Sequence, residues 1–237
     1  MKRIVLIFMI LAWAVLPEQT FGLELFGYTE PIRIAQAAFA ESGVLDAIFV
    51  REGDHVGEGD VLAHLDIAVL ERDLNIAKEA KRIQNMHHAQ LENLFEEERV
   101  SAVEIERSRS DTLIAEERVQ RILAQLDARI LRAPFDGVIV RVFRERSENI
   151  SAARAEVLTI AQLDVLQVVL HVPLERIEYF DQQRPLPVIL EDEIEAEAQI
   201  VFVSPVIDAA SRTIRVRLEI PNPDGVLRAG MICRIRL

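Results

Sequence analysis

Few residues in this chain are of types that do chemistry, and their spacing favours structural roles. His87 and His88 are neighbours in the sequence, and Glu92 is the nearest carboxylate at helical spacing. Side chains of helix neighbours point about 100° apart, so the two imidazoles cannot easily share one metal ion, and Glu92 fits a solvated helix face. We therefore predict no metal site.

The glycines at positions 53, 57 and 59 would suit a phosphate-binding loop only if a helix began within a few residues. No helical pattern starts before Ile67, so turns explain these glycines better. Cys233 is the only cysteine, which excludes an internal disulfide and a cysteine-based zinc site. From these residues we predict no bound cofactor and no catalytic centre.

The overall charge argues against a nucleic-acid partner. The chain has 27 basic and 39 acidic residues, and its net charge of -12 repels phosphates. With 50% apolar residues, 237 residues can bury a core and hold more than one small domain. Arginines gather near the C-terminus, where they either face outward from strands or form a docking strip: Arg212, Arg215, Arg217, Arg228, Arg234 and Arg236.

The N-terminus has the pattern of an export signal over residues 1–22. Lys2 and Arg3 precede an apolar run over residues 4–16, and Thr20-Phe21-Gly22 places small residues where a signal peptidase cleaves. We predict cleavage near Gly22. A run of 13 apolar residues is short for a membrane span, and an uncleaved anchor is the alternative prediction.

Two antiparallel helices are predicted over residues 67–130. Residues at steps of three and four place each set on one helical stripe. The first stripe is Ile67, Leu70, Leu74, Ala77, Lys81, Gln84, His88, Leu91, Phe95 and Glu98, and the second is Ser101, Ile105, Ser108, Thr112, Ala115, Val119, Ile122 and Leu126. The connection is so short that the helices must be neighbours.

The two stripes change character from the base of the hairpin to its turn. Leu70 and Leu74 face Val119, Ile122 and Leu126 near the base, whereas the outer half is polar or small, so we expect the outer half to gain stability from a partner. Near the turn an apolar cluster has an acidic rim and resembles a docking surface: Leu91, Leu94, Phe95, Val100 and Val103. Ser101 can cap the second helix, with Glu104 reaching back to the Ser101 amide.

Pro134 predicts that the second helix stops at Ile130–Arg132.

Beyond the second helix, a β-segment from the first part of the chain repeats. At a shift of 94 residues, Gly43-Val44 aligns with Gly137-Val138, and residues 53–56 align with 147–150. One unit alone cannot bury its apolar face, so the two units must pair. We predict one domain built from residues 40–66 and 131–164.

Alternating apolar residues predict further strands and a turn in the C-terminal part. The strands are expected at residues 165–172, 187–190, 197–203, 214–220 and 231–237, with one more at 33–38 in an N-terminal segment over 23–39, and the turn at Asn222-Pro223-Asp224-Gly225. A small β-barrel over residues 165–237 follows. The predicted fold class is mainly β with an inserted α-helical hairpin.

Two stretches, SGVLDAIFVREGDHVGEGDVLAHLD and RAPFDGVIVRVFRERSENISAARAEVLTI, resemble the halves of a biotinyl/lipoyl-like β-sandwich split by an α-hairpin. This arrangement resembles the periplasmic adaptor proteins, or membrane fusion proteins, of tripartite efflux pumps. The stretch VIDAASRTIRVRLEIPNPDGVLRAGMICRIRL is similar to the closing β-barrel motif of the branch that serves RND transporters. The resemblance covers nearly all of residues 27–237.

The resemblance implies an adaptor in the periplasm, peripheral to the inner membrane, with no chemistry of its own and hence not an enzyme. It would link an inner-membrane RND-type transporter to an outer-membrane channel protein for efflux of small molecules or metal ions, and copies would self-associate into a ring. An adaptor of an ABC-type exporter is the alternative. The hairpin tip would meet the channel, and the matching positions are Leu94, Val100, Ser101, Glu104 and Glu106. Asn93 stands where the family usually has an arginine.

A lipoyl or biotin carrier is a further alternative, since such carriers use the same sandwich. They hold the cofactor on a lysine at the turn between the halves, and the three lysines, Lys2, Lys78 and Lys81, lie elsewhere. We therefore expect no lipoyl or biotin group.

Adaptors of RND pumps usually add a membrane-proximal domain, but little precedes Ile34 and nothing follows Leu237, so we expect the barrel to contact the transporter.

Overall fold

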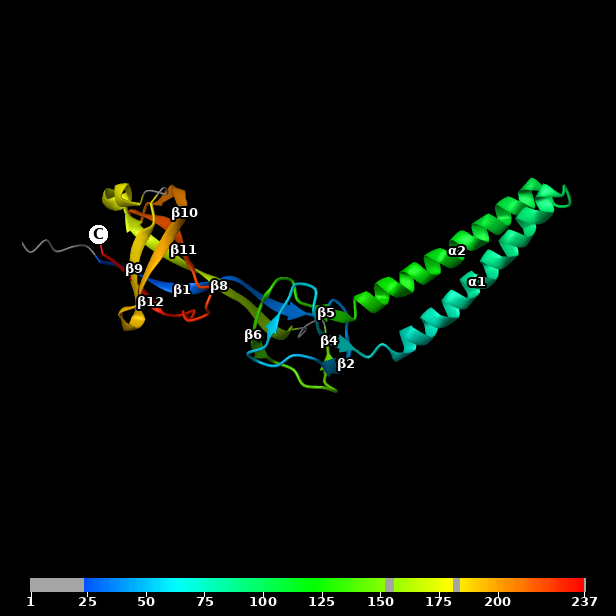
Figure 1. Ribbon diagram of the computed structural model, residues 1–237, viewed down its shortest axis with the longest axis horizontal. Helices are drawn as coiled ribbons and strands as arrows, with labels where there is room; N and C mark the ends of the chain where they lie inside the picture. Colours follow the sequence, from blue (N-terminus) through cyan, green and yellow to red (C-terminus); the bar gives the residue numbers. More distant parts are fainter. Residues whose placement is uncertain (1–23, 152–155, 181–183, 237) are drawn as a thin grey trace, which may run out of the picture.

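The computed structural model describes residues 24–151, 156–180 and 184–236. They form an elongated molecule, with a barrel at one end, a β-sandwich in the middle and a helical hairpin at the other end (Figure 1). The predicted fold class, mainly β with an inserted hairpin, is confirmed. The predicted signal peptide lies outside the described residues.

Two sheets form the sandwich. One contains β5 (Ile130–Arg132), β4 (Val61–Leu65), β2 (Gly43–Ile48) and β7 (Asn149–Ile150), in this order. The other contains β3 (His55–Val56), β6 (Gly137–Val142) and parts of two longer strands, β8 (Glu156–Pro173) and β1 (Glu24–Ala38). The apolar core between the sheets includes Leu45, Leu62, Leu65, Ile139, Ile150, Leu158 and Ile160.

The two halves of the sandwich pair with each other by exchanging equivalent strands. β2 pairs with β7 through Gly43 and Ile150, and β3 pairs with β6 through Val56 and Gly137. Gly137 lies 94 residues after Gly43, and Ile150 lies 94 residues after Val56, so the two pairings are equivalent. The sandwich therefore has an internal two-fold pseudosymmetry, and neither half closes without the other.

The turns before β3 and β7 repeat in the same way. Gly53 has a φ of 92°, and Ser147, 94 residues later, has a φ of 71°. The Asp54 carboxylate accepts a hydrogen bond of 2.7 Å from the amide three residues earlier, and the Glu148 carboxylate accepts one of 3.0 Å in the equivalent place. The second turn thus keeps the left-handed conformation of the first without a glycine, which carries a steric cost.

The inserted hairpin consists of α1 (Ala68–Glu96) and α2 (Ala102–Asp127), which lie side by side and antiparallel (Figure 1). The prediction that the second helix reaches Ile130–Arg132 was wrong. These residues form β5, which pairs with β4 through Ile130 and His64. The sheet satisfies their backbone groups, so the helix ends earlier, at Asp127.

Six strands close the barrel, in the order β1, β12 (Ile232–Arg236), β9 (Leu186–Leu190), β10 (Glu195–Asp208), β11 (Thr213–Pro221) and β8, which pairs back to β1. In the described part of the chain, short 3-10 helices at Leu174–Tyr179 and Glu191–Glu193 lie between strands. The predicted turn after β11 is confirmed, because the Gly225 amide donates to the Asn222 carbonyl over 3.1 Å and Gly225 has a φ of 64°.

β1 and β8 run through both domains. Along one edge, β8 pairs with β6 up to Ala161 and with β11 from Val165 onward. β1 pairs along the other edge of β8. The barrel strand predicted at residues 33–38 was misplaced: these residues pair with β8 in the sandwich, and residues 24–28 of the same strand pair with β12 in the barrel.

The misplacement has a physical reason. In the barrel part of β1, Gly27 and Thr29 are buried, whereas Phe26 and Tyr28 are exposed, which inverts the usual pattern of apolar burial. Glycine is required at the inward position, since a Cβ on Gly27 would lie 2.7 Å from Cγ1 of Val168.

One buried polar side chain joins the two domains. Asn222, 4% exposed, donates from Nδ2 to the carbonyls of Leu163 (2.8 Å) and Leu227 (3.0 Å), and its Oδ1 accepts from the Leu227 amide (2.9 Å). Leu163 lies in the segment of β8 between its sandwich and barrel pairings. The Asn222 side chain thus fastens the loop after β11 to the junction between the domains.

Candidate docking site at the hairpin tip

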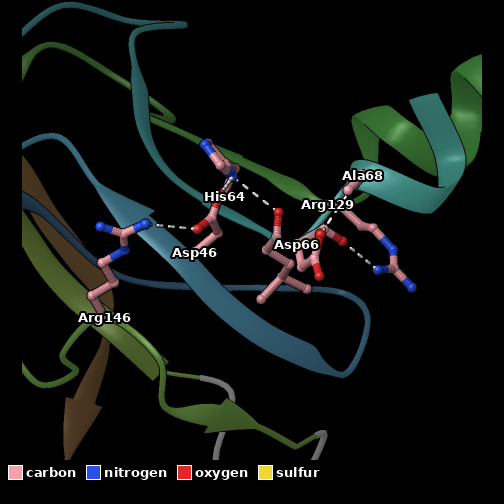
Figure 2. A network of polar contacts seen from close by, with 7 residues as sticks. Asp46, His64, Asp66, Ala68, Arg129 and Arg146 are labelled. Atoms are coloured by element: carbon pink, nitrogen blue, oxygen red, sulfur yellow. Dashed lines mark hydrogen bonds and ion pairs between the residues drawn. The ribbon is translucent and has the colours of Figure 1, made fainter. Parts of the chain in front are cut away.

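The hairpin is anchored where β4 ends and β5 begins. The Leu65 amide donates to the Arg129 carbonyl over 3.0 Å, and Nη1 of Arg129 donates to the Asp66 carbonyl over 2.7 Å (Figure 2). Nε of Arg129 also lies 3.3 Å from a carboxylate oxygen of Glu41. Oδ1 of Asp66 accepts from the Ala68 amide over 3.0 Å, which satisfies one of the free amides at the start of α1. Arg129 therefore ties the end of α2 to the start of α1.

A second group of polar contacts lies beside this anchor (Figure 2). The Asp46 carboxylate on β2 lies 3.3 Å from Nη2 of Arg146 and 3.8 Å from Nδ1 of His64 on β4. The His64 ring also contacts the Phe49 ring, with 5.4 Å between centroids. These contacts join both halves of the sandwich immediately below the hairpin.

Near its base, the seam between the helices is packed as predicted. Leu74 and Ala77 of α1 and Val119 and Ile122 of α2 are buried in one cluster, with Leu126 packed against it. Burial of aliphatic side chains stabilises this half of the hairpin.

The middle of the seam is polar, which the sequence also predicted. The Lys81 ammonium forms an ion pair with Glu116, and the His88 ring is 3.1 Å from the Ser108 hydroxyl. Lys81, followed by the Gln120 amide, holds the pKa of Glu116 below its ordinary value. Among the described residues, the buried hydroxyl of Thr112 has no hydrogen-bond partner. A buried unpaired hydroxyl is destabilising, so this part of the seam packs less favourably than the base.

At the tip, α1 ends in a tight left-handed turn. Glu98 has a φ of 59°, its amide donates to the Phe95 carbonyl over 2.9 Å, and the Arg99 amide donates to the Leu94 carbonyl over 2.8 Å. These two bonds define a Schellman motif, in which glycine usually occupies the position of Glu98. α2 then begins with the predicted cap, since the Ser101 hydroxyl accepts from the Glu104 amide over 3.3 Å. No bond from the Ser101 amide to the Glu104 carboxylate occurs in the described tip.

The five predicted site residues all lie in or next to this turn. Leu94 occupies the last turn of α1, Val100 and Ser101 lie between the helices, and Glu104 and Glu106 lie in the first turns of α2. Ser101, Glu104 and Glu106 are exposed, whereas Leu94 and Val100 are half-buried. The structure therefore brings these residues together at the end of the molecule farthest from the barrel (Figure 1).

The structure separates three apolar residues near the turn by their exposure. Leu91 is buried in the seam and is not available for docking. Phe95, placed on the inner stripe by its spacing, is 43% exposed, because the stripe drifts around a long helix. Val103 is 78% exposed, more than any other large hydrophobic residue of the turn.

The tip is acidic as well as apolar. Glu96, Glu97 and Glu98 follow one another at the C-terminal end of α1, where the helix dipole disfavours negative charge. Arg99 lies 3.2 Å from Glu97 and offsets part of this charge. Acidic groups placed against the dipole contribute little to the fold, which fits a surface that meets a partner.

Neither a metal centre nor a membrane span is evident at the hairpin. In the described ranges, no group of three or more histidine, cysteine, aspartate or glutamate side chains is arranged to hold a metal ion. His88 lies in the seam, 3.4 Å from Glu92 and bonded to Ser108. No helix in the part of the chain that the structure describes is long and apolar enough to cross a bilayer.

Comparison with known proteins agrees with this architecture. Residues 192–237 match the family described as the CusB-like β-barrel domain. The chain is 27% identical over 238 residues to the antibiotic efflux pump periplasmic linker protein ArpA of Pseudomonas putida, covering 92% of this chain and 63% of that protein. The chain thus spans less than two thirds of this curated relative.

Solved structures show the same fold. A MacA–MexA chimera containing the Pseudomonas aeruginosa MexA α-hairpin superposes with a TM-score of 0.77 at 19% identity, covering 91% of this chain and 81% of the chimera. The membrane fusion protein Spr0693 of Streptococcus pneumoniae R6 superposes with a TM-score of 0.71 at 18% identity, covering 90% and 97%. The molecule has the fold of the membrane fusion proteins. The predicted resemblance to periplasmic adaptors of efflux pumps is confirmed by the fold, the barrel match and the sequence relatives.

Proposed function

We propose that this chain is the periplasmic adaptor of a tripartite efflux system, and that it links an inner-membrane transporter of the RND type to an outer-membrane channel. The observation that carries the proposal is the hairpin tip, an exposed apolar and acidic surface at the far end of an arm built on a split sandwich. The match of the barrel to the CusB-like domain supports the RND type over an ABC-type exporter. We assign no catalytic step to the chain.

We propose that the channel contacts Leu94, Val100, Ser101, Glu104 and Glu106. The exposed apolar side chains of Phe95 and Val103 lie in the same turn and extend this surface. Apolar side chains with a polar rim are typical of a protein interface.

Neighbouring copies are proposed to cover the flank of the hairpin. Val69, Ile76 and Ile83 of α1 are 68%, 64% and 52% exposed and lie seven residues apart. Apolar residues at this spacing form the seam between packed helices. Their exposure on a single copy therefore supports self-association into a ring through side-by-side hairpins.

The test is a charge at the tip that leaves the fold intact. Val103→Asp places a carboxylate near the start of α2, where the helix dipole favours it, so folding should be unaffected. Burying this charge against a partner is costly, and we expect export to fall to the level of cells that lack the protein. Val103→Thr, of similar shape but uncharged, should export nearly normally.

The measurement is susceptibility to exported compounds in cells that carry each variant, together with the periplasmic level of the protein. Normal export by Val103→Asp at normal protein level would contradict the proposed docking site. Crosslinking in the same cells identifies the transporter, and recovery of an ATP-hydrolysing exporter would contradict the RND assignment.

A further inference from the structure

The barrel carries an exposed aromatic surface that its own fold does not use. Phe26 and Tyr28 on β1 are 59% and 63% exposed, and Ile232 on β12 is 38% exposed. In the β1–β12 pairing, Tyr28 lies opposite Ile232 and Phe26 lies opposite Arg234. These four side chains therefore occupy one outer face of a two-stranded ribbon, and we call them the β1–β12 patch.

Arginine flanks the apolar part of this patch. Arg234 is half-buried beside Phe26, and Arg236 follows on the same face of β12. Arg236 lies 3.1 Å from the Glu24 carboxylate, whereas none of the ion pairs of the described residues involves Arg234. The patch thus contains a positive charge on Arg234 that no ion pair of the described residues offsets, while the exposed Glu30 lies two residues after Tyr28 on the same face of β1.

The position of the patch in the molecule indicates what it meets. β1 and β12 belong to the barrel, at the end opposite the hairpin tip (Figure 1). The apolar run over residues 4–16 ends eight residues before Glu24, and eight extended residues span at most about 29 Å. While this segment remains in the inner membrane during export, it holds the start of β1 within that distance of the membrane.

The size and chemistry of the patch favour a lipid surface over a protein. Three partly exposed apolar side chains offer roughly 300 Å², whereas a stable protein interface buries about 800 Å² on each partner. Tyrosine and other amphipathic aromatic side chains prefer the level of the lipid headgroups. Arginine next to them is attracted by anionic lipids.

We propose that the β1–β12 patch binds the periplasmic surface of the inner membrane, with Phe26 and Tyr28 inserted among the headgroups and Arg234 beside anionic lipid. This inference rests on the proposed export and orientation of the adaptor. It adds a direct contact between barrel and bilayer, and it orients the molecule so that the hairpin points away from the membrane.

The experiment uses the protein purified from the periplasm and vesicles of phosphatidylethanolamine and phosphatidylglycerol. We expect it to sediment with these vesicles, and the double variant Phe26→Ser, Tyr28→Ser to lose about ten-fold in binding because shallow insertion scales with buried apolar area. The matched control is Val206→Ser, Ile207→Ser, which changes two exposed apolar residues of β10 and should bind as wild type. Arg234→Gln should weaken binding to these vesicles more than to neutral phosphatidylcholine vesicles.

Two outcomes would overturn the proposal: no sedimentation of the wild-type protein, or equal sedimentation of the patch and control variants. If the patch variant lost export in cells while the wild-type protein did not bind vesicles, the patch would contact a protein, which also overturns it. Val103→Asp should bind vesicles normally, so this assay fails or succeeds independently of the tip experiment.

Discussion

The base and the tip of the hairpin differ in the exposure of their apolar side chains and in how the ends of the helices are held. At the base, Leu74 and Ile122 are 9% and 6% exposed, and Arg129 ties both helix ends to the sandwich. At the tip, Val103 is 78% exposed, and three successive glutamates oppose the helix dipole. The seam at the base is therefore packed within a single copy, whereas the tip leaves large apolar side chains exposed.

The largest expected effect on stability concerns the base. Ile122→Ala removes buried volume from the cluster with Leu74 and Val119 and should lower the free energy of unfolding by about 2–5 kcal/mol. The adjacent Leu123, which is 39% exposed, provides the control, and Leu123→Ala should cost less than about 1 kcal/mol. Urea unfolding followed by the helical circular dichroism signal measures both. Similar losses for the two variants would show that the base is not a packed core.

The sequence predicted the base better than the tip, because the base follows from periodicity. Spacings of three and four identified Leu74, Val119 and Ile122 as inward residues, and all three are buried. The same argument failed for Phe95, since small deviations from 3.6 residues per turn accumulate over the 29 residues of α1. A pattern defines a stripe near its centre more reliably than at its ends.

The sandwich and the anchor show a similar contrast. The repeat at a shift of 94 predicted which strands pair, because both units must bury the same face. The end of α2 at Asp127 was not predicted, since it depends on the pairing of β5 with β4. The bonds of Arg129 to Asp66 and Glu41 were not predicted either, because these residues are 63 and 88 positions away and no local pattern links them.

The second prediction sharpens the comparison at the tip itself. Glu98 has a φ of 59°, a conformation in which a side chain clashes with the backbone and glycine does not. Glu98→Gly should therefore stabilise the turn by about 0.5–1 kcal/mol. Glu97→Gly removes the same charge at a φ of -82°, where glycine adds flexibility and the ion pair with Arg99 is also lost, and should destabilise by up to about 1 kcal/mol.

Amide hydrogen exchange of residues 90–105 is the suitable measurement for both variants, because the tip can open without global unfolding. Slower exchange in Glu98→Gly and faster exchange in Glu97→Gly are expected. If both variants exchanged faster, the left-handed turn would not exist in solution. If Glu98→Gly also kept normal export, the Glu98 side chain would be unnecessary for docking.

The smallest expected effect lies between base and tip and depends on pH. Lys81, followed by Gln120, lowers the pKa of Glu116 in the folded protein, so the ionised carboxylate is favoured by folding. Its contribution to stability is therefore present at neutral pH and above the ordinary glutamate pKa, and is lost as the pH falls through the lowered value. Glu116→Gln should be less stable than wild type at pH 7, and the stabilities of the two proteins should converge in acid as the wild-type carboxyl becomes neutral.

The control is Glu117→Gln, an exposed change on the same helix, whose stability should follow that of wild type more closely at both extremes of pH. Thermal unfolding at a series of pH values measures these differences, and a gap between wild type and Glu116→Gln that widened in acid would show that the ion pair does not join the helices in solution.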